Sequence, residues 1–260
     1  MSINIDLSGH VAIVTGGGKG VGRGITQRFL DAGSEVVICG RSAPDDLPTA
    51  DGRTAVFFEA DVREAEDIDR LVAQTMDRFG RIDALVNNAG GAPFREAAKA
   101  SARFNDKIIA LNLTGPLNFA QRVNAVMQEQ ESGGAIVNIA SVSAVRPSPG
   151  TAAYGAAKAG LLSATRSLAV EWAPRVRVNA ITAGMVRTEQ AHLHYGDDAA
   201  IARVSATVPL GRLGLPTEVG DACVFFASPL SSYVTGASLL LHGGGEPPPF
   251  LAAAAGEKGD

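Results

Sequence analysis

Short apolar segments alternate with longer segments of helical character along the sequence. The apolar segments are rich in valine, isoleucine and alanine, which is typical of strands covered on both faces of a parallel sheet. The alternation therefore predicts an α/β fold with a single doubly wound parallel sheet and helices on both faces. The predicted strands are 11–14, 35–39, 54–58, 84–86, 135–139, 176–181 and 238–241, and the predicted helices are 21–32, 64–79, 102–128, 152–172 and 216–227.

The chain of 260 residues is long enough to bury a substantial core. No segment is rich enough in Gly, Ser or Pro to divide it, so residues 1–245 are expected to form a single domain. Residues 246–260 contain three consecutive prolines and an alanine run, and this C-terminal tail is expected to be peripheral or disordered. The polar segment 42–51 is predicted to be a loop.

A glycine-rich segment joins the first predicted strand to the first predicted helix. Its glycines include Gly16, Gly20 and Gly22, in a G-x-x-x-G-x-G spacing within the segment 15–22. Backbone N–H groups and the positive end of the helix meet there, so this segment is suited to a pyrophosphate group. The alternative is a tight strand-to-helix turn that binds no ligand.

The end of the second predicted strand bears on the choice of dinucleotide. Enzymes that use NAD usually carry an acid about twenty residues past the glycine loop, for the ribose 2′-hydroxyl. Here the strand ends in Cys39-Gly40-Arg41, with no acid at that point. Arg41 and Lys19 are instead suited to a 2′-phosphate, so NADP is favoured and NAD is the alternative. Both cations are otherwise ordinary surface residues.

Tyr154 and Lys158 form a pair of chemical interest. A tyrosine hydroxyl is a poor acid or base near neutral pH because its ordinary pKa is about 10. A lysine four positions later lies on the same face of a helix, where its charge favours the phenolate. Ser141 precedes Tyr154 by 13 positions. Taken alone, Tyr154 would be read as an ordinary residue of an amphipathic helix.

These features together resemble the short-chain dehydrogenase/reductase family, in its form of about 250 residues and in its 3-oxoacyl reductase-like members. The resemblance covers nearly the whole chain and implies a Rossmann-type fold. The matching positions are the T-G-x-x-x-G-x-G loop, Asp61-Val62, Asn87-Asn88-Ala89-Gly90, Asn112, Ser141, Tyr154 with Lys158, and Asn179.

The resemblance implies a role for each catalytic candidate. Tyr154 acts as general acid or base, while Lys158 lowers the tyrosine pKa and binds the nicotinamide ribose. Ser141 holds the substrate oxygen. Asn112 holds a water molecule of a proton path, although a buried amide that only binds backbone is the alternative reading.

The resemblance also implies a set of cofactor-binding positions. Asp61 and Val62 are expected at the adenine, and Thr188 at the nicotinamide carboxamide. The full set of expected cofactor-binding residues is Gly16, Lys19, Gly20, Val21, Gly22, Arg41, Asp61, Val62, Asn88, Ala89, Gly90, Tyr154, Lys158 and Thr188.

The predicted function is therefore an NADP-dependent oxidoreductase that interconverts a ketone and a secondary alcohol. A cofactor-binding sensor or structural subunit without turnover is the alternative from another class. The substrate is a small molecule, and acyl thioesters, steroid-like ketones and sugar-derived ketones all stay open. Residues 185–209 are expected to form the flap over it.

Composition argues against several other classes. The net charge of -4 gives no electrostatic case for nucleic acid or a membrane surface. The chain has two cysteines, and no metal site is expected. The N-terminus lacks a signal sequence, so the expected location is cytoplasmic.

The segment 152–173 is apolar over more than one face, which predicts a homotetramer, with a dimer as the fallback.

Overall fold

Seven parallel strands form the centre of the protein, in the order β5-β2-β1-β6-β7-β8-β9. The structure is a computed structural model that describes residues 5–248 and 250. The strand order reverses beside β1, so the predicted doubly wound sheet is confirmed. The strands are β1 (Val11–Thr15), β2 (Glu35–Gly40), β5 (Val56–Glu59), β6 (Ala84–Asn87), β7 (Gly134–Ser141), β8 (Val176–Ala183) and β9 (Ser238–Leu241).

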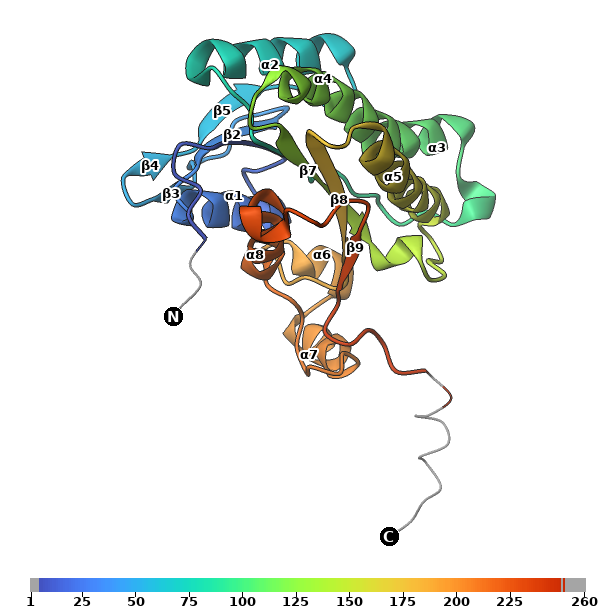
Figure 1. The fold of residues 1–260 in the computed structure, drawn as a ribbon. Coiled ribbons are helices and arrows are strands. Elements are labelled where there is room, and N and C mark those ends of the chain that lie inside the picture. Colours follow the sequence, from blue (N-terminus) through green and yellow to red (C-terminus); the bar gives the residue numbers. More distant parts are fainter. Residues whose placement is uncertain (1–4, 249, 251–260) are drawn as a thin grey trace.

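Helices cover both faces of this sheet (Figure 1). On one face lie α1 (Gly20–Asp31) and α8 (Pro216–Ala227), which pack against each other. On the other face lie α2 (Ala65–Phe79), α4 (Gly115–Glu129) and α5 (Ala152–Glu171). The shorter helices are α3 (Ala102–Ile109), α6 (Ala191–Tyr195) and α7 (Asp198–Ala206).

The central strand β1 shows why the strands are apolar on both sides. Successive side chains of a strand point to opposite faces. Ala12 and Val14 belong to the apolar cluster that includes Phe29 of α1, whereas Ile13 belongs to the cluster that includes Phe119 of α4. All five of these side chains are fully buried or nearly so, so β1 has no solvent-exposed face to make polar.

Three predicted elements differ from the observed ones. Within the predicted loop 42–51, β3 (Thr49–Ala50) pairs in antiparallel fashion with β4 (Arg53–Thr54), and β5 begins only at Val56. Asp51 and Gly52 between them have φ of 47° and 78°, the backbone that a two-residue hairpin requires. The predicted helix 102–128 contains a π-helical turn, η2 (Ala110–Thr114), between α3 and α4.

A buried polar chain connects the sheet to α5. Asn87 of β6 donates its amide hydrogen to Asn138 Oδ1 of β7 at 2.9 Å, and Asn138 donates to Thr165 Oγ1 of α5 at 2.9 Å. Side-chain amides in an apolar interior are costly unless they are paired, so this chain favours one position of α5 on the sheet.

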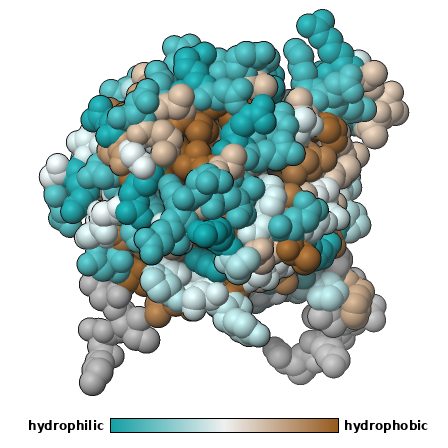
Figure 2. Space-filling view, turned by 45° about the horizontal axis from the view of Figure 1, so that its top comes forward, coloured by the Kyte–Doolittle hydropathy of each residue, from teal (hydrophilic) through white to brown (hydrophobic). Residues whose placement is uncertain are grey.

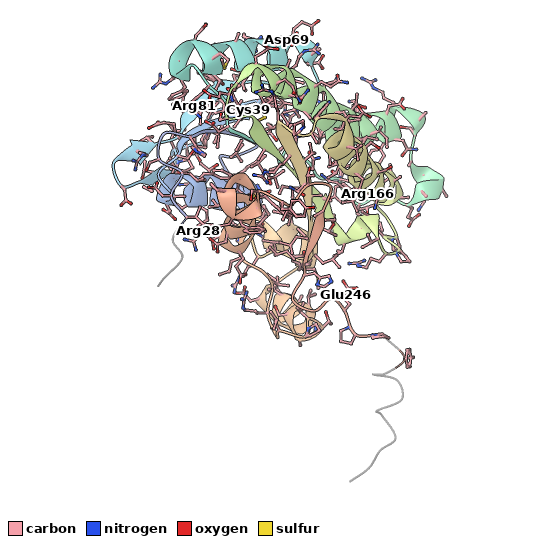
Figure 3. The ribbon with its side chains drawn as sticks, in the orientation of Figure 1. Arg28, Cys39, Asp69, Arg81, Arg166 and Glu246 are labelled. Carbon is pink, nitrogen blue, oxygen red and sulfur yellow. The ribbon has the colours of Figure 1, made fainter. Side chains whose placement is uncertain are left out.

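The predicted C-terminal tail begins at Glu246. Glu246, which follows β9 (Figure 3), forms an ion pair with Arg146 at 2.7 Å. Residues 249 and 251–260 of the predicted tail lie outside the described residues.

Figure 2 shows apolar patches between hydrophilic side chains on one face. Within the described part of the chain, no helix is both long and apolar enough to cross a membrane.

Candidate active site

The glycine loop is fixed to the strand beside it by one threonine. Thr15, the last residue of β1, accepts hydrogen bonds on its Oγ1 from the backbone N–H groups of Asn88 and Ala89, each at 2.9 Å. Asn88 in turn donates its side-chain amide to Thr15 O at 2.9 Å. The ends of β1 and β6 therefore form one rigid edge. Thr15 was not among the predicted site residues, although the T-G pair at the start of the loop was a signal for it.

The glycine loop is closely packed, and one of its N–H groups already binds a carboxylate. A Cβ at Gly22 would lie 2.1 Å from the carbonyl oxygen of Gly16, so only glycine fits there. The N–H of Gly20, at the start of α1, donates to Glu189 Oε1 at 2.8 Å. A carboxylate of the chain itself thus occupies the position at which the helix N-terminus attracts negative charge.

Residues 185–209, the expected flap, bring Glu189 and Thr188 to this loop. A Cβ at Gly20 would lie 3.7 Å from Thr188 Cγ2, so the predicted cofactor residue Thr188 is beside the glycine loop. Glu189 was not predicted as a site residue. It lies 169 positions from Gly20 along the chain, and the sequence carries no periodic signal for a contact of that separation.

The two predicted phosphate-binding cations are both exposed to solvent. Among the described residues, neither Lys19 nor Arg41 takes part in an ion pair. Asp61 is bound by Arg63, whose Nε donates to Asp61 Oδ1 at 2.9 Å. Hydrogen bonding from Arg63 lowers the pKa of Asp61, and the charge of Arg41 adds a smaller effect in the same direction. Arg41 is therefore near the predicted adenine position.

Lys158 is a buried charged group at this edge of the sheet. Its side chain is 2% exposed, and its Nζ donates to the carbonyl oxygen of Ile139 in β7 at 2.8 Å. The same Nζ lies 5.7 Å from the centre of the Tyr154 ring. Burial lowers the pKa of Lys158 to about 8, because a charged ammonium loses its hydration there.

Tyr154 is brought to Ser141 by the packing of α5 on the end of β7. Burial raises the pKa of Tyr154, and its hydrogen bond with Ser141 opposes that rise. The pKa of Tyr154 is therefore raised rather than lowered as expected from Lys158, because burial is the largest effect on it. Ser143 and Ser148 are hydrogen-bonded to each other at 3.0 Å. Ser141 is the serine that contacts the tyrosine, as the spacing predicted.

Asn112 lies in the π-helical turn η2 and is fully buried. Its amide donates to Ile108 O at 2.9 Å and to Gly91 O at 3.0 Å, and its Oδ1 accepts from the N–H of Gly91 at 2.9 Å. A Cβ at Gly90 would lie 2.7 Å from Asn112 Oδ1 and 3.2 Å from Lys158 Nζ. Asn112 thus holds the segment after β6 against Lys158, which matches the buried-amide reading; its role with water stays a prediction.

Comparison with known proteins gives a consistent result. The family model described as enoyl-(acyl carrier protein) reductase matches residues 16–246. The L-rhamnose 1-dehydrogenase (NAD(P)(+)) of Azotobacter vinelandii is 37% identical, over 91% of this chain and 96% of its own. The chain belongs to the short-chain dehydrogenase/reductase family.

Further relatives of this short-chain dehydrogenase/reductase act on different compounds. The 3-oxoacyl-(acyl-carrier-protein) reductase of Synechocystis is 35% identical, over 91% of this chain and 97% of its own. The solved structure of aldohexose dehydrogenase from Thermoplasma acidophilum matches with a TM-score of 0.86 and 31% identity, over 93% of this chain and 96% of that one. Members of the family use NAD(P). The closely packed glycine loop, with the Gly20 N–H directed at a carboxylate, fits the binding of a dinucleotide phosphate at that place.

The position of Glu189 leads to a prediction for dinucleotide affinity. The substitution Glu189→Gln removes a negative charge from the start of α1, so the pyrophosphate meets less repulsion and less competition. Affinity for the dinucleotide is expected to rise by about two- to fivefold, the usual size of a charge effect at a helix end. Isothermal titration calorimetry measures it, with the exposed Glu131→Gln as control. Unchanged affinity in Glu189→Gln would show that the carboxylate does not compete.

Proposed function

We propose that this short-chain dehydrogenase/reductase interconverts a ketone and a secondary alcohol by hydride transfer, with NADP as the preferred dinucleotide. One observation carries the proposal. The side chain of Ser141 is close enough to the Tyr154 hydroxyl to lower its pKa, and both lie beside the buried ammonium of Lys158, at the same sheet edge as the glycine loop. One edge of the sheet would therefore hold both the dinucleotide, which exchanges the hydride, and Tyr154, which exchanges the proton.

The chain's own residues handle the proton and the orientation of the substrate. Tyr154 gives its hydroxyl proton to the carbonyl oxygen during reduction and takes it back during oxidation. Ser141 donates a hydrogen bond to the same oxygen, which stabilises the negative charge that develops on it. Lys158 supplies a positive charge beside the ring of Tyr154. The bound dinucleotide supplies or accepts the hydride.

Charge around the ribose supports the preference for NADP. Lys19 and Arg41 are exposed and take no part in the ion pairs of the described residues, so their charges are available to a 2′-phosphate. Asp46, which is near the glycine loop, is paired with Arg23 at 2.5 Å. Its charge is therefore compensated and does not repel a phosphate.

The role of Tyr154 is tested by removing one oxygen atom. Tyr154→Phe keeps the ring and removes the proton donor, so turnover is expected to fall by a factor on the order of 10² or more. Dinucleotide binding, measured separately by fluorescence titration, is expected to stay within about twofold of the wild type because the phenyl ring still fills the same space. Near-normal turnover of the Phe variant would show that another group is the acid.

The role of Arg41 is tested by the ratio of the two dinucleotide affinities. Arg41→Ala removes a charged hydrogen-bond partner of the 2′-phosphate, a contact worth about 1.5–3 kcal/mol. The Kd for NADPH is expected to rise by about tenfold or more, with the Kd for NADH nearly unchanged. Arg53→Ala, in the hairpin, is the control and is expected to leave both Kd values unchanged. Equal affinity of the wild type for NADPH and NADH would contradict the preference itself.

We also infer that the enzyme assembles as a homotetramer, with a dimer as the fallback. The outer face of α5 is exposed and made largely of small residues, and it ends at Val170, which is 81% exposed. The edge strand β9 exposes Leu239 and Leu240. Two separate apolar surfaces suit two kinds of two-fold contact. Light scattering at micromolar concentration tests this, and a stable particle with the mass of one chain would contradict it.

A further inference from the structure

A cavity of about 250 Å³ adjoins the predicted catalytic serine. It lies between the turn that follows Ser141, the segment after β8 and the segment after β9. Val142, the neighbour of Ser141, and Met185 form part of an apolar wall. Arg146, His242 and Glu246 are its polar lining. Pockets for drug-sized ligands usually measure about 300–1,000 Å³, so this cavity suits a smaller molecule.

The polar end of the cavity is an ion pair between distant parts of the chain. Arg146 Nη2 donates to Glu246 Oε1 at 2.7 Å, and both side chains are 40% exposed. Arg146 Nη1 also donates to Pro147 O at 3.1 Å. The two opposite charges compensate each other, so an anionic substrate group gains little net attraction at this end. A fully apolar substrate would displace water from both charged groups and offer no hydrogen bonds in its place, which is unfavourable.

Glu246 is placed at the cavity by the backbone that leads to it. Gly243 and Gly244 have φ of 65° and 98°, in the region that side chains disfavour. A Cβ at Gly243 would lie 2.6 Å from Val208 Cγ1, and one at Gly244 would lie 2.8 Å from Pro209 Cβ. The segment is therefore packed closely on the flap, and Glu246 is held in position rather than carried on a loose end.

The hydroxyl of Tyr195 is within electrostatic range of this ion pair and of Tyr154. Burial raises the pKa of Tyr195. Smaller electrostatic effects on the same hydroxyl come from Tyr154, Arg146 and Glu246. The charges of Arg146 and Glu246, which line the cavity, thus act on the hydroxyl of Tyr195, on which Tyr154 also acts.

We propose that Arg146 and Glu246 determine specificity, by binding hydroxyl groups of a small, uncharged, polyhydroxylated substrate of monosaccharide size. Each hydroxyl both donates and accepts a hydrogen bond. The N–H groups of Arg146 and the carboxylate oxygens of Glu246 offer donors and acceptors side by side, which matches two neighbouring hydroxyls. The apolar wall then faces the C–H side of the ring. The inference rests on the proposed function and names its substrate class.

The test compares two substrates of the same ring size. An aldohexose panel and cyclohexanol are offered with NADP⁺ and NAD⁺, together with a 3-hydroxyacyl thioester and a 3-hydroxysteroid. For the wild type, kcat/KM is expected to be at least tenfold higher for the best aldohexose than for cyclohexanol. Glu246→Gln and Arg146→Leu are expected to raise KM for that aldohexose about tenfold while leaving KM for cyclohexanol within about twofold, since one hydrogen bond to a charged group is worth about 1.5–3 kcal/mol.

Controls and contrary results separate this inference from the proposed function. Asp221→Asn, which breaks the exposed pair of Asp221 with Arg28, is expected to leave both KM values unchanged. Turnover of the thioester or the steroid with no preference for aldohexoses overturns the substrate class and leaves the oxidoreductase standing. Equal effects of Glu246→Gln on aldohexose and cyclohexanol overturn the role of the pair. Failure to turn over any of the four classes overturns both proposals.

Discussion

The arrangement of the candidate active site depends on one buried charge, the ammonium of Lys158. It is 2% exposed, and the hydrogen bond it donates to protein is to the carbonyl of Ile139. Its pKa of about 8, against an ordinary value of 10.5, corresponds to a cost of about 3 kcal/mol for keeping the group charged at neutral pH. A group this costly is retained in a fold for what it does there, and the ring of Tyr154 is beside it.

The surroundings of Lys158 are built from backbone rather than from side chains. Gly90 has no side chain, and a Cβ there would collide with Asn112 and crowd the Lys158 ammonium. Asn112 holds the next residue, Gly91, by two hydrogen bonds and is itself carried by a π-helical turn. The polar chain through Asn138 and Thr165 fixes α5, which carries Tyr154 and Lys158, on the sheet. The geometry of the candidate site therefore follows from how α5 and the end of β6 are anchored.

The sequence predicted those parts of the molecule that have a local signal. Apolar strands and helical segments gave the sheet, and the spacing of Ser141, Tyr154 and Lys158 indicated a contact that the structure contains. The hairpin at Asp51-Gly52 was missed, because its strands have two residues each and no measurable periodicity. The contacts of Glu189 with Gly20 and of Glu246 with Arg146 join residues 169 and 100 positions apart. Contacts between residues this far apart in the sequence depend on the fold, and no local sequence pattern predicts them. The direction of the Tyr154 pKa depended on burial, which spacing does not report.

The free energy of unfolding as a function of pH, for the wild type and Lys158→Met, tests the central claim most directly. The cost of the charged lysine is fully present below pH 8 and disappears as the pH rises toward 10.5, where the unfolded lysine also loses its proton. The stability of the Met variant relative to the wild type is therefore expected to fall by about 2–3 kcal/mol between pH 7 and pH 10, while its turnover is lost throughout. A stability difference that does not change with pH would contradict the account, because Lys158 would then be an ordinary structural residue.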